Sequence, residues 1–290
     1  MTVSDQENQL VAQLIRLYDA REASNIADLV IENVTGLKKM DRMLNKTRSL
    51  SADQENQLIK YSAQLLREAP VQYVLHESWF FGQKFYVDES TLIPRPETEE
   101  LVAWVVEDFG QLKNKREPAV KILEVGSGSG CIPIIIKKKL PGAELISCDI
   151  SEAALQVAKK NSKDHGVTID FLQLDFFDRN AWSRIPTVQC IVSNPPYVSA
   201  KEKASMRSNV LKYEPEQALF VPNEDPLIFY RAIGEFAREK LAHSGQIYVE
   251  INEHLGQESA SLFSTQGFSR IEIKKDMQGK DRMIKATWLL

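Results

Sequence analysis

The chain has 290 residues, of which 43% are hydrophobic and 26% are charged. This composition is typical of a folded globular protein long enough to bury two cores, and it excludes a disordered or a fibrous protein. The formal net charge of −4 excludes a protein that binds nucleic acid mainly by covering its phosphates with lysine and arginine, although a local basic patch stays open.

The cysteines and the first residues indicate where the protein works. Cys131, Cys148 and Cys190 lie on or beside predicted core segments, and their odd number favours reduced thiols over a disulfide framework. The first residues have neither the positive start nor the apolar stretch of a signal peptide, and no run approaches about 18 apolar residues. We therefore expect a cytoplasmic protein without membrane segments.

Residues 1–68 are predicted to form a helical domain. Two segments have the capping-box pattern, in which a serine at the helix start is followed three residues later by an acid or an amide: Ser4 with Glu7, and Ser51 with Gln54. Apolar residues follow each box at helical spacing, and Gly36 is a predicted helix end between them. The domain carries no candidate catalytic group, and a scaffold that only covers the rest of the chain is one interpretation of it.

Residues 69–95 are predicted to form a β-hairpin linker, because aromatic and β-branched residues recur around Gly82. We expect strands at 73–75, 79–81 and 85–87. Prolines then flank Arg95, and Pro96 suits the first turn of a helix that continues to residue 108. The restricted Arg95 guanidinium either faces a cofactor or substrate, or pairs with Glu97 or Glu100.

A glycine loop is the first candidate site in residues 96–290. An apolar run at 121–125 enters Gly126-Ser127-Gly128-Ser129-Gly130, and a second run ends in Asp149, 19 residues after Gly130. Glycines let the backbone approach a bulky ligand, and an acid at the end of the next strand is where a nucleotide-binding βαβ unit holds a ribose. No Lys-Ser/Thr pair follows the glycines, so a triphosphate site is not indicated.

The second candidate site is Asn194-Pro195-Pro196-Tyr197, which directly follows the apolar run 188–193. The prolines stiffen the loop and remove two N–H donors, which leaves the Asn194 side-chain oxygen and the Pro195 carbonyl as acceptors for both hydrogens of a planar NH2 group. The Tyr197 ring can cover the face of that group. A side-chain amide and an exocyclic base amine both fit, and a stiff turn with a packed tyrosine is the alternative.

The rest of the chain completes a predicted sheet. About 27 residues rich in charge and proline follow Tyr197, which is long for a simple connection, so we expect a binding loop or lid that includes Glu214. A helix from 225 to about 243 and strands at 246–251, 268–274 and 283–289 come next, the last two as an antiparallel hairpin around Gly279. Ligand loops that both end strands predict a Rossmann-like α/β domain, and together the two loops point to S-adenosylmethionine.

The chain resembles the release factor glutamine methyltransferases in five blocks, at residues 70–75, 92–101, 123–130, 193–198 and 213–219. The segment 93–99, Ile-Pro-Arg-Pro-Glu-Thr-Glu, is the most specific to that family, since Asn-Pro-Pro-Tyr is shared with many amino-methyltransferases acting on DNA. The resemblance implies a class I S-adenosylmethionine-dependent methyltransferase domain with a small N-terminal helical domain that grips the substrate. The implied reaction methylates the side-chain amide nitrogen of the glutamine in the Gly-Gly-Gln loop of peptide chain release factors and leaves S-adenosylhomocysteine. The family usually has glycine where His76 stands.

Residue roles follow from the two loops and from the resemblance. The expected cofactor-binding residues are Gly126, Ser127, Gly128, Ser129, Gly130, Asp149, Asp175, Phe176 and Asn194. Asp175 and Phe176 are implied by the resemblance alone, as an acid and an aromatic that hold the adenine; a core phenylalanine is the alternative for Phe176. The expected catalytic residues are Asn194, Pro195 and Tyr197, and the expected substrate-binding residues are Asn194, Pro195, Pro196, Tyr197, Arg95 and Glu214. No metal site is expected.

Two alternatives to glutamine methylation stay open. A DNA adenine or cytosine amino-methyltransferase would present a similar NH2 group to the same loop by base flipping, but it would normally bring a basic surface that the acidic charge balance does not indicate. A cofactor-binding interaction protein without activity is the other alternative, and the retention of Asn194, Asp149 and the three loop glycines speaks against it. We expect a monomer that makes no sequence-specific contact with nucleic acid.

Overall fold

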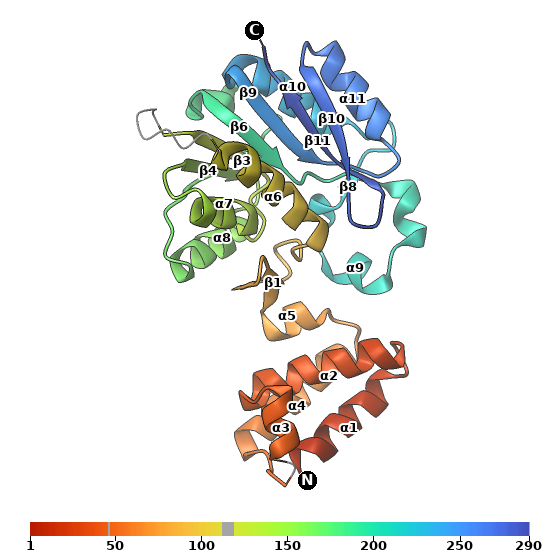
Figure 1. Cartoon of the computed structure of the whole chain (residues 1–290). Helices are drawn as coiled ribbons and strands as arrows, with labels where there is room; N and C mark the ends of the chain where they lie inside the picture. Colours follow the sequence, from red (N-terminus) through yellow and green to blue (C-terminus); the bar gives the residue numbers. More distant parts are fainter. Residues whose placement is uncertain (46, 112–118, 290) are drawn as a thin grey trace. The chain divides into compact units, whose positions relative to one another are not determined.

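The structure is a computed structural model that describes residues 1–45, 47–111 and 119–289 (Figure 1). The chain divides into two compact units, one formed by Met1–Glu77 with Arg207–Tyr213 and the other by Ser78–Met206 with Glu214–Leu290. Among the described residues, no helix is both long and apolar enough to cross a bilayer.

The first unit consists of helices around one apolar core. They are α1 (Val3–Leu14), α2 (Ala20–Thr35), α3 (Lys39–Leu44), α4 (Ala52–Leu65), α5 (Val71–Leu75) and, from a distant part of the chain, α9 (Ser208–Tyr213). Leu14, Val30 and Leu65 are fully buried in this core. The expected helical domain at the N-terminus is therefore confirmed.

The helix ends of this unit follow the capping chemistry with one correction. The Ser51 box with Gln54 begins α4, and Gly36 ends α2 in the left-handed region, both as expected. The box assigned to Ser4 and Glu7 is wrong, because Thr2 caps α1: its hydroxyl accepts from the Asp5 N–H at 3.2 Å, and the Asp5 carboxylate accepts from the Thr2 N–H at 2.9 Å. Starting the helix two residues earlier places Val3 in the core.

The predicted strand at residues 73–75 is also wrong, because these residues lie in helix α5. Val71, Val74 and Leu75 recur at helical spacing and pack on the core of the first unit, and this burial decides against an extended chain. His76 ends the helix with a φ of +52°, a left-handed conformation that explains why glycine suits this position. The predicted hairpin begins only after it, as β1 (Ser78–Phe80) and antiparallel β2 (Gln83–Phe85) around Gly82.

The second unit is built on a seven-stranded sheet with the order β10-β11-β9-β6-β3-β4-β5. Its strands are β3 (Lys121–Val125), β4 (Glu144–Asp149), β5 (Asp170–Gln173), β6 (Val188–Ser193), β9 (Leu241–Glu250), β10 (Ser269–Lys275) and β11 (Asp281–Thr287). Neighbours from β9 to β5 pair in parallel, whereas β11 pairs antiparallel with β9 and with β10. The predicted hairpin around Gly279 is thus confirmed. Central β6 is mostly apolar and is buried at every position except Gln189, as expected of a strand covered on both faces.

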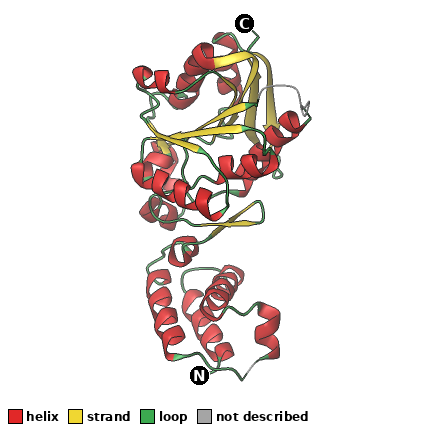
Figure 2. Cartoon of the chain, turned by 90° about the vertical axis from the view of Figure 1, so that its left-hand side faces the viewer, coloured by secondary structure: helices red, strands yellow, loops and turns green. Residues whose placement is uncertain are grey.

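Helices cover both faces of this sheet (Figure 2). On one face, α6 (Pro96–Gly110) and α7 (Cys131–Lys139) share a core with the hairpin residues Phe80 and Phe85. On the other, Phe236 of α10 (Ile228–Lys240) and Phe263 of α11 (Gly256–Thr265) share a core with Trp182. The predicted Rossmann-like α/β fold is confirmed, and the chain reverses its direction across the sheet between β3 and β6, where open α/β sheets bind ligands.

The long segment after Tyr197 contains short elements. Besides α9 it holds β7 (Val198–Ser199), which pairs in parallel with β8 (Phe220–Val221), and two 3-10 turns, Ala200–Ser205 and Glu216–Ala218. The segment is therefore structured along much of its length, and its role as a binding loop or lid stays a prediction.

Candidate functional site

A cavity of about 450 Å3 opens in the second unit at the carboxyl ends of β3, β4 and β6. It is lined by most of the residues that the sequence singled out: Arg95, Gly126, Ser127, Gly128, Ser129, Asp149, Asp175, Phe176, Asn194, Pro195 and Pro196. Gly130, Tyr197 and Glu214 are not part of its lining. Two loops separated by more than 60 residues in the chain therefore meet at one cavity, as the sheet topology predicts.

The glycine loop after β3 forms one wall of this cavity. Gly126 and Gly128 have φ values of +87° and +48°, and a Cβ added to either would meet no atom within 4 Å. These two glycines are therefore required by backbone conformation, and they leave open space at the ligand side. Gly130 has another role, since a Cβ there would lie 3.0 Å from Ala158 Cβ, so it lets α7 approach α8 (Glu152–Asp164).

Two carboxyl groups, the half-buried Asp149 and the buried Glu124, lie beside this loop. Asp149 accepts the N–H of Gly128 at 3.0 Å and the N–H of Ser151 at 2.9 Å, and burial raises its pKa against these two donors. Glu124, in β3, accepts a hydrogen bond from the Ser147 hydroxyl, and burial raises its pKa well above the usual range. The sequence interpretation missed Glu124, although an acid inside an otherwise apolar strand just before the glycines is a signal that could have revealed it.

The aromatic wall of the cavity differs from the one expected. Phe176 lines the cavity but is only 6% exposed and packs on Trp182 and Phe236, with ring centroids 5.9 and 5.2 Å apart. Phe177 lines the cavity too, is 44% exposed and lies 4.9 Å from Phe229, another lining residue. Phe177 and Phe229 are therefore additional candidates for contact with a planar ligand.

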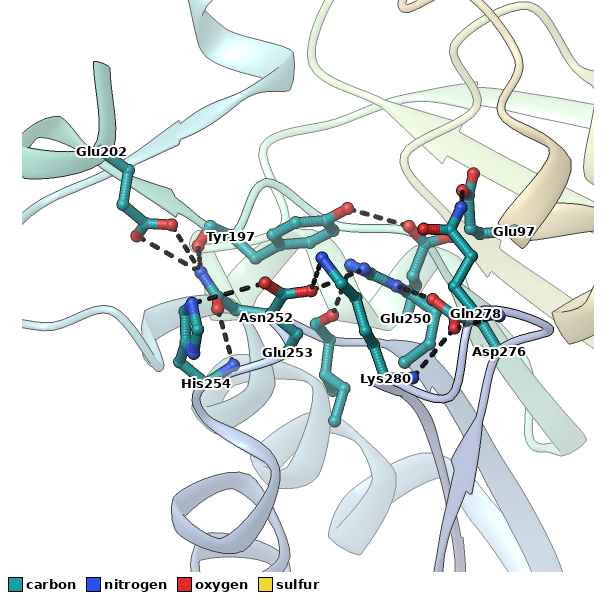
Figure 3. Close-up of polar contacts among 12 residues, drawn as sticks. Glu97, Tyr197, Glu202, Glu250, Asn252, Glu253, His254, Asp276, Gln278 and Lys280 are labelled. Carbon is teal, nitrogen blue, oxygen red and sulfur yellow. Dashed lines mark hydrogen bonds and ion pairs between the residues drawn. The ribbon is translucent and has the colours of Figure 1, made fainter. Parts of the chain in front are cut away.

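The Asn194 loop follows β6 and is held by side chains from distant elements. Asn194 Nδ2 donates to Thr98 Oγ1 of α6 at 3.0 Å. The Tyr197 hydroxyl donates at 2.9 Å to Oε1 of Glu250, at the end of β9 (Figure 3). Burial, followed by the nearby Glu250 charge, raises the pKa of Tyr197 well above its ordinary value, so the phenol stays protonated and remains a donor.

Arg95 has a different partner from the two considered. Its Nη2 lies 2.6 Å from Oε1 of Glu214, whose Oε2 accepts the Ile93 N–H at 3.1 Å. The expected pairing with Glu97 or Glu100 is corrected, because those carboxylates accept hydrogen bonds from the β10–β11 turn. Glu214 is buried and Arg95 is about one-third exposed, so the pair anchors the segment after Tyr197 while Arg95 still faces the cavity.

The sequence interpretation gave no role to Thr98, although it lies in the segment 93–99, and it missed Glu250. Both are buried, at 2% and 1% exposure, and both lie in elements that otherwise present apolar residues to the core. Their link to Asn194 depends on contacts across 96 and 152 residues of chain, which no local pattern reveals.

Comparison with known proteins places the chain among methyltransferases. The Methyltransferase small domain matches residues 110–217, and the PrmC N-terminal domain matches residues 9–75. A protein of Flavobacterium psychrophilum named release factor glutamine methyltransferase is 40% identical over 99% of this chain and 100% of its own length. A protein of the same name from Bacteroides thetaiotaomicron is 38% identical over 93% of this chain and 94% of its own length.

Solved structures agree with the fold. The hMettl16 catalytic domain in complex with MAT2A 3'UTR hairpin 6 has a TM-score of 0.55 at 14% identity, with 82% of each chain covered. The human methyltransferase 10 domain containing protein has a TM-score of 0.51 at 16% identity, with 72% of this chain and 90% of that chain covered. At such identities the likeness concerns the fold alone.

The sheet order, the cavity and these matches define the class of the protein: it is a methyltransferase with the class I fold and an N-terminal helical domain. Within that class, the chain belongs to the release factor glutamine methyltransferase family. The methyltransferase domain implies use of S-adenosylmethionine, and the cavity fits such a ligand. Its volume is in the usual range for small-molecule sites, and its wall combines an open glycine loop, an acidic group and exposed aromatic edges.

Proposed function

We propose that this protein transfers the methyl group of S-adenosylmethionine to the side-chain amide nitrogen of the glutamine in the Gly-Gly-Gln loop of peptide chain release factors. The observation that carries the proposal is Asn194 at the cavity wall, with Nδ2 bonded to Thr98 and Oδ1 left as an acceptor. The relatives with this name match nearly the whole chain, including the helical region before the cavity. A cytoplasmic location follows from a substrate that works in translation termination.

The cofactor is assigned to the glycine-loop side of the cavity. Gly126, Ser127, Gly128, Ser129 and Gly130 form the proposed backbone cradle, in which Gly130 acts by letting α7 pack closely. Asp149, Asp175, Phe176 and Asn194 complete the set proposed from the sequence, and Glu124, Phe177 and Phe229 join it from the cavity lining. S-adenosylmethionine, when bound, supplies a methyl group already activated on a sulfonium, so no nucleophilic side chain is needed.

The substrate amide is assigned to the Asn194 loop. An amide nitrogen is a weak nucleophile because its lone pair is delocalised, and acceptors for both of its hydrogens favour the geometry in which that pair faces the reacting carbon. Asn194 Oδ1 and the Pro195 carbonyl are the proposed acceptors, and Pro196 and Tyr197 keep the loop in shape. Alignment of this kind accounts for several kcal/mol of barrier, as in well-oriented intramolecular reactions. The displaced N–H proton leaves to water.

Arg95 and Glu214 complete the proposed substrate-binding set as an ion pair beside the cavity. The DNA amino-methyltransferase alternative is not favoured, because the near-full-length relatives carry the protein-methyltransferase name and the net charge is −4. Transfer of a methyl group to release factor would exclude the alternative of a cofactor-binding protein without activity.

The test is transfer of labelled methyl from S-adenosylmethionine to purified release factor, beside a version whose Gly-Gly-Gln glutamine is replaced by alanine and beside unmethylated DNA. Label on the intact factor alone is the expected result. Label on DNA, or equal label on the Gln→Ala factor, would overturn the substrate assignment, and no transfer to any of them would favour an inactive protein.

A further inference from the structure

We propose that Thr98 and Glu250 are positioning residues that fix which end of the Asn194 side-chain amide faces the cavity. The inference rests on the proposed function and deepens it, since it explains how a side chain with one donor end and one acceptor end presents the acceptor to the substrate. This role does not require either residue to contact the substrate or the cofactor.

The three groups form a continuous hydrogen-bonded chain inside the second unit. Asn194 Nδ2 donates to Thr98 Oγ1 at 3.0 Å, and Thr98 Oγ1 donates to Glu250 Oε2 at 2.7 Å. Tyr197 occupies the other oxygen, since its hydroxyl donates to Glu250 Oε1 at 2.9 Å (Figure 3). Thr98 and Glu250 are almost completely buried, so water does not compete for these bonds.

The direction of these hydrogen bonds follows from the number of hydrogens that each group can donate. A carboxylate only accepts hydrogen bonds, so both hydroxyls must point their single hydrogen at Glu250. Thr98 then has no hydrogen left and can only accept, which requires the NH2 end of Asn194 to face it. The carbonyl end of Asn194 is thereby the end left for the ligand. A charge in β9 thus dictates the polarity of a side chain in the loop after β6.

Three neighbours of Glu250 favour its carboxylate form. Burial raises its pKa, but the two hydroxyl donors oppose that effect, and so does the positive charge of Arg282. Arg282 is itself fixed, with Nε 3.2 Å from Asp276 Oδ2 and Nη2 3.4 Å from Glu253 Oε2. Tyr197 is held at its other end by Asn252 Nδ2, which donates to its backbone oxygen at 3.3 Å.

The first test compares Thr98→Val with Thr98→Ser. Valine keeps the shape but removes the acceptor for Asn194, so we expect kcat for release factor methylation to fall about 10- to 100-fold while the Kd for S-adenosylmethionine changes by less than about threefold. Serine restores the hydroxyl and should bring kcat back to within about threefold of the wild type. Thr287→Val is the matched control, because Thr287 is equally buried but lies in β11. Unchanged kcat in Thr98→Val, or no rescue by serine, would overturn the proposal.

The second test separates the carboxylate from the backbone at the same residue. Tyr197→Phe removes a donor to the Glu250 carboxylate, whereas Tyr230→Phe removes a donor to the Glu250 backbone oxygen, 3.2 Å away. Glu250→Gln replaces one of the two acceptor oxygens with an NH2 donor, so it should lower kcat as Thr98→Val does. We expect losses of kcat in Tyr197→Phe and Glu250→Gln but not in Tyr230→Phe, although Tyr230 is the more deeply buried tyrosine. Equal losses in both phenylalanine variants would contradict the carboxylate role.

A third readout needs no turnover. The Asn194 side-chain NH2 resonances, identified by their loss in Asn194→Ala, should shift in Thr98→Val and return in Thr98→Ser, because one hydrogen loses its acceptor. Unshifted resonances would overturn the positioning role even if the wild-type enzyme is active. A wild-type protein that transfers no methyl group to release factor would overturn the proposed function instead, while shifted resonances would still establish the hydrogen-bonded chain.

Discussion

The two loops at the cavity hold their polar groups in different ways. After β3, the glycine loop takes its shape from its own backbone and from the neighbouring strand: the N–H groups of Gly126 and Ser127 donate to Cys148 O, and Gly128 donates to Asp149. After β6, Asn194 takes its orientation from side chains in α6 and β9. The region proposed for the cofactor is thus locally determined, whereas the region proposed for the substrate amide depends on residues far away in the sequence.

This difference separates binding from turnover. A substitution in the glycine loop should act mainly on cofactor affinity, because that loop contributes backbone and space. A substitution among the hydrogen-bonded groups that hold Asn194 should act mainly on kcat, because the alignment of the substrate amide matters most in the transition state.

Asn194→Ala should show the largest effect. Removing the proposed acceptor should lower kcat about 1,000-fold, as loss of one well-placed transition-state hydrogen bond does in other enzymes. The Kd for S-adenosylmethionine should stay within about threefold of the wild type, since the glycine loop is untouched. Single-turnover methylation and calorimetric titration measure the two quantities. A loss of affinity as large as the loss of turnover would end the distinction between the two regions.

Glu124→Gln should affect stability in the opposite direction to function. The pKa of this buried carboxyl is raised in the folded protein, so the group costs stability at pH values above its ordinary pKa. We expect glutamine to raise the free energy of unfolding by about 2 kcal/mol at pH 8 without cofactor. Affinity for S-adenosylmethionine should fall, because Glu124 lines the cavity. Chemical denaturation and calorimetric titration of the same samples measure both effects.

The stability gained by Glu124→Gln should depend on pH. Because the folded pKa lies above the ordinary value of 4.5, the wild type loses stability as pH rises from there through the folded pKa, and the glutamine variant does not. The gain should therefore vanish near pH 4 and grow with pH. Glu144→Gln, at an exposed position of the neighbouring strand, is the control and should change stability by less than about 0.5 kcal/mol. A gain that is independent of pH would mean that the charge is not its cause.

The sequence predicted the loops at the cavity but not the distant side chains that hold Asn194. The glycine loop, Asp149 and the Asn194 loop could be located because each is a short pattern at the end of an apolar run, and the sheet topology then brings them together. The roles of Thr98 and Glu250 could not be predicted, because they exist only through packing across α6, β6 and β9. The strand expected at 73–75 failed for a related reason, since tertiary burial made a β-type segment helical.

The Arg95–Glu214 ion pair is intermediate between the glycine loop and the Asn194 loop. Glu214 is buried and Arg95 partly exposed, so removing either partner leaves the other without its charge-assisted hydrogen bond. In a double-mutant cycle with Arg95→Ala and Glu214→Gln, we expect a coupling of about 1.5 kcal/mol in the free energy of unfolding. Both single variants should raise KM for release factor by similar factors, and the double variant should be no worse. A larger KM effect of Arg95→Ala in both backgrounds would instead show that Arg95 acts on the substrate without its partner.

Gly128→Ala should show the smallest effect and the cleanest one. Gly128 and Gly279 have φ values of +48° and +82°, and at neither would a new Cβ meet an atom within 4 Å, so alanine should cost each about 1 kcal/mol of stability through backbone conformation alone. Only Gly128 lines the cavity and donates to Asp149. Gly128→Ala should therefore weaken S-adenosylmethionine binding about 5- to 10-fold, with kcat at saturation within about twofold of the wild type, whereas Gly279→Ala should change neither. A drop in kcat for Gly128→Ala, measured at saturating cofactor, would mean that the glycine loop also aligns the reacting groups, and the two loops would then have to be treated as one catalytic unit.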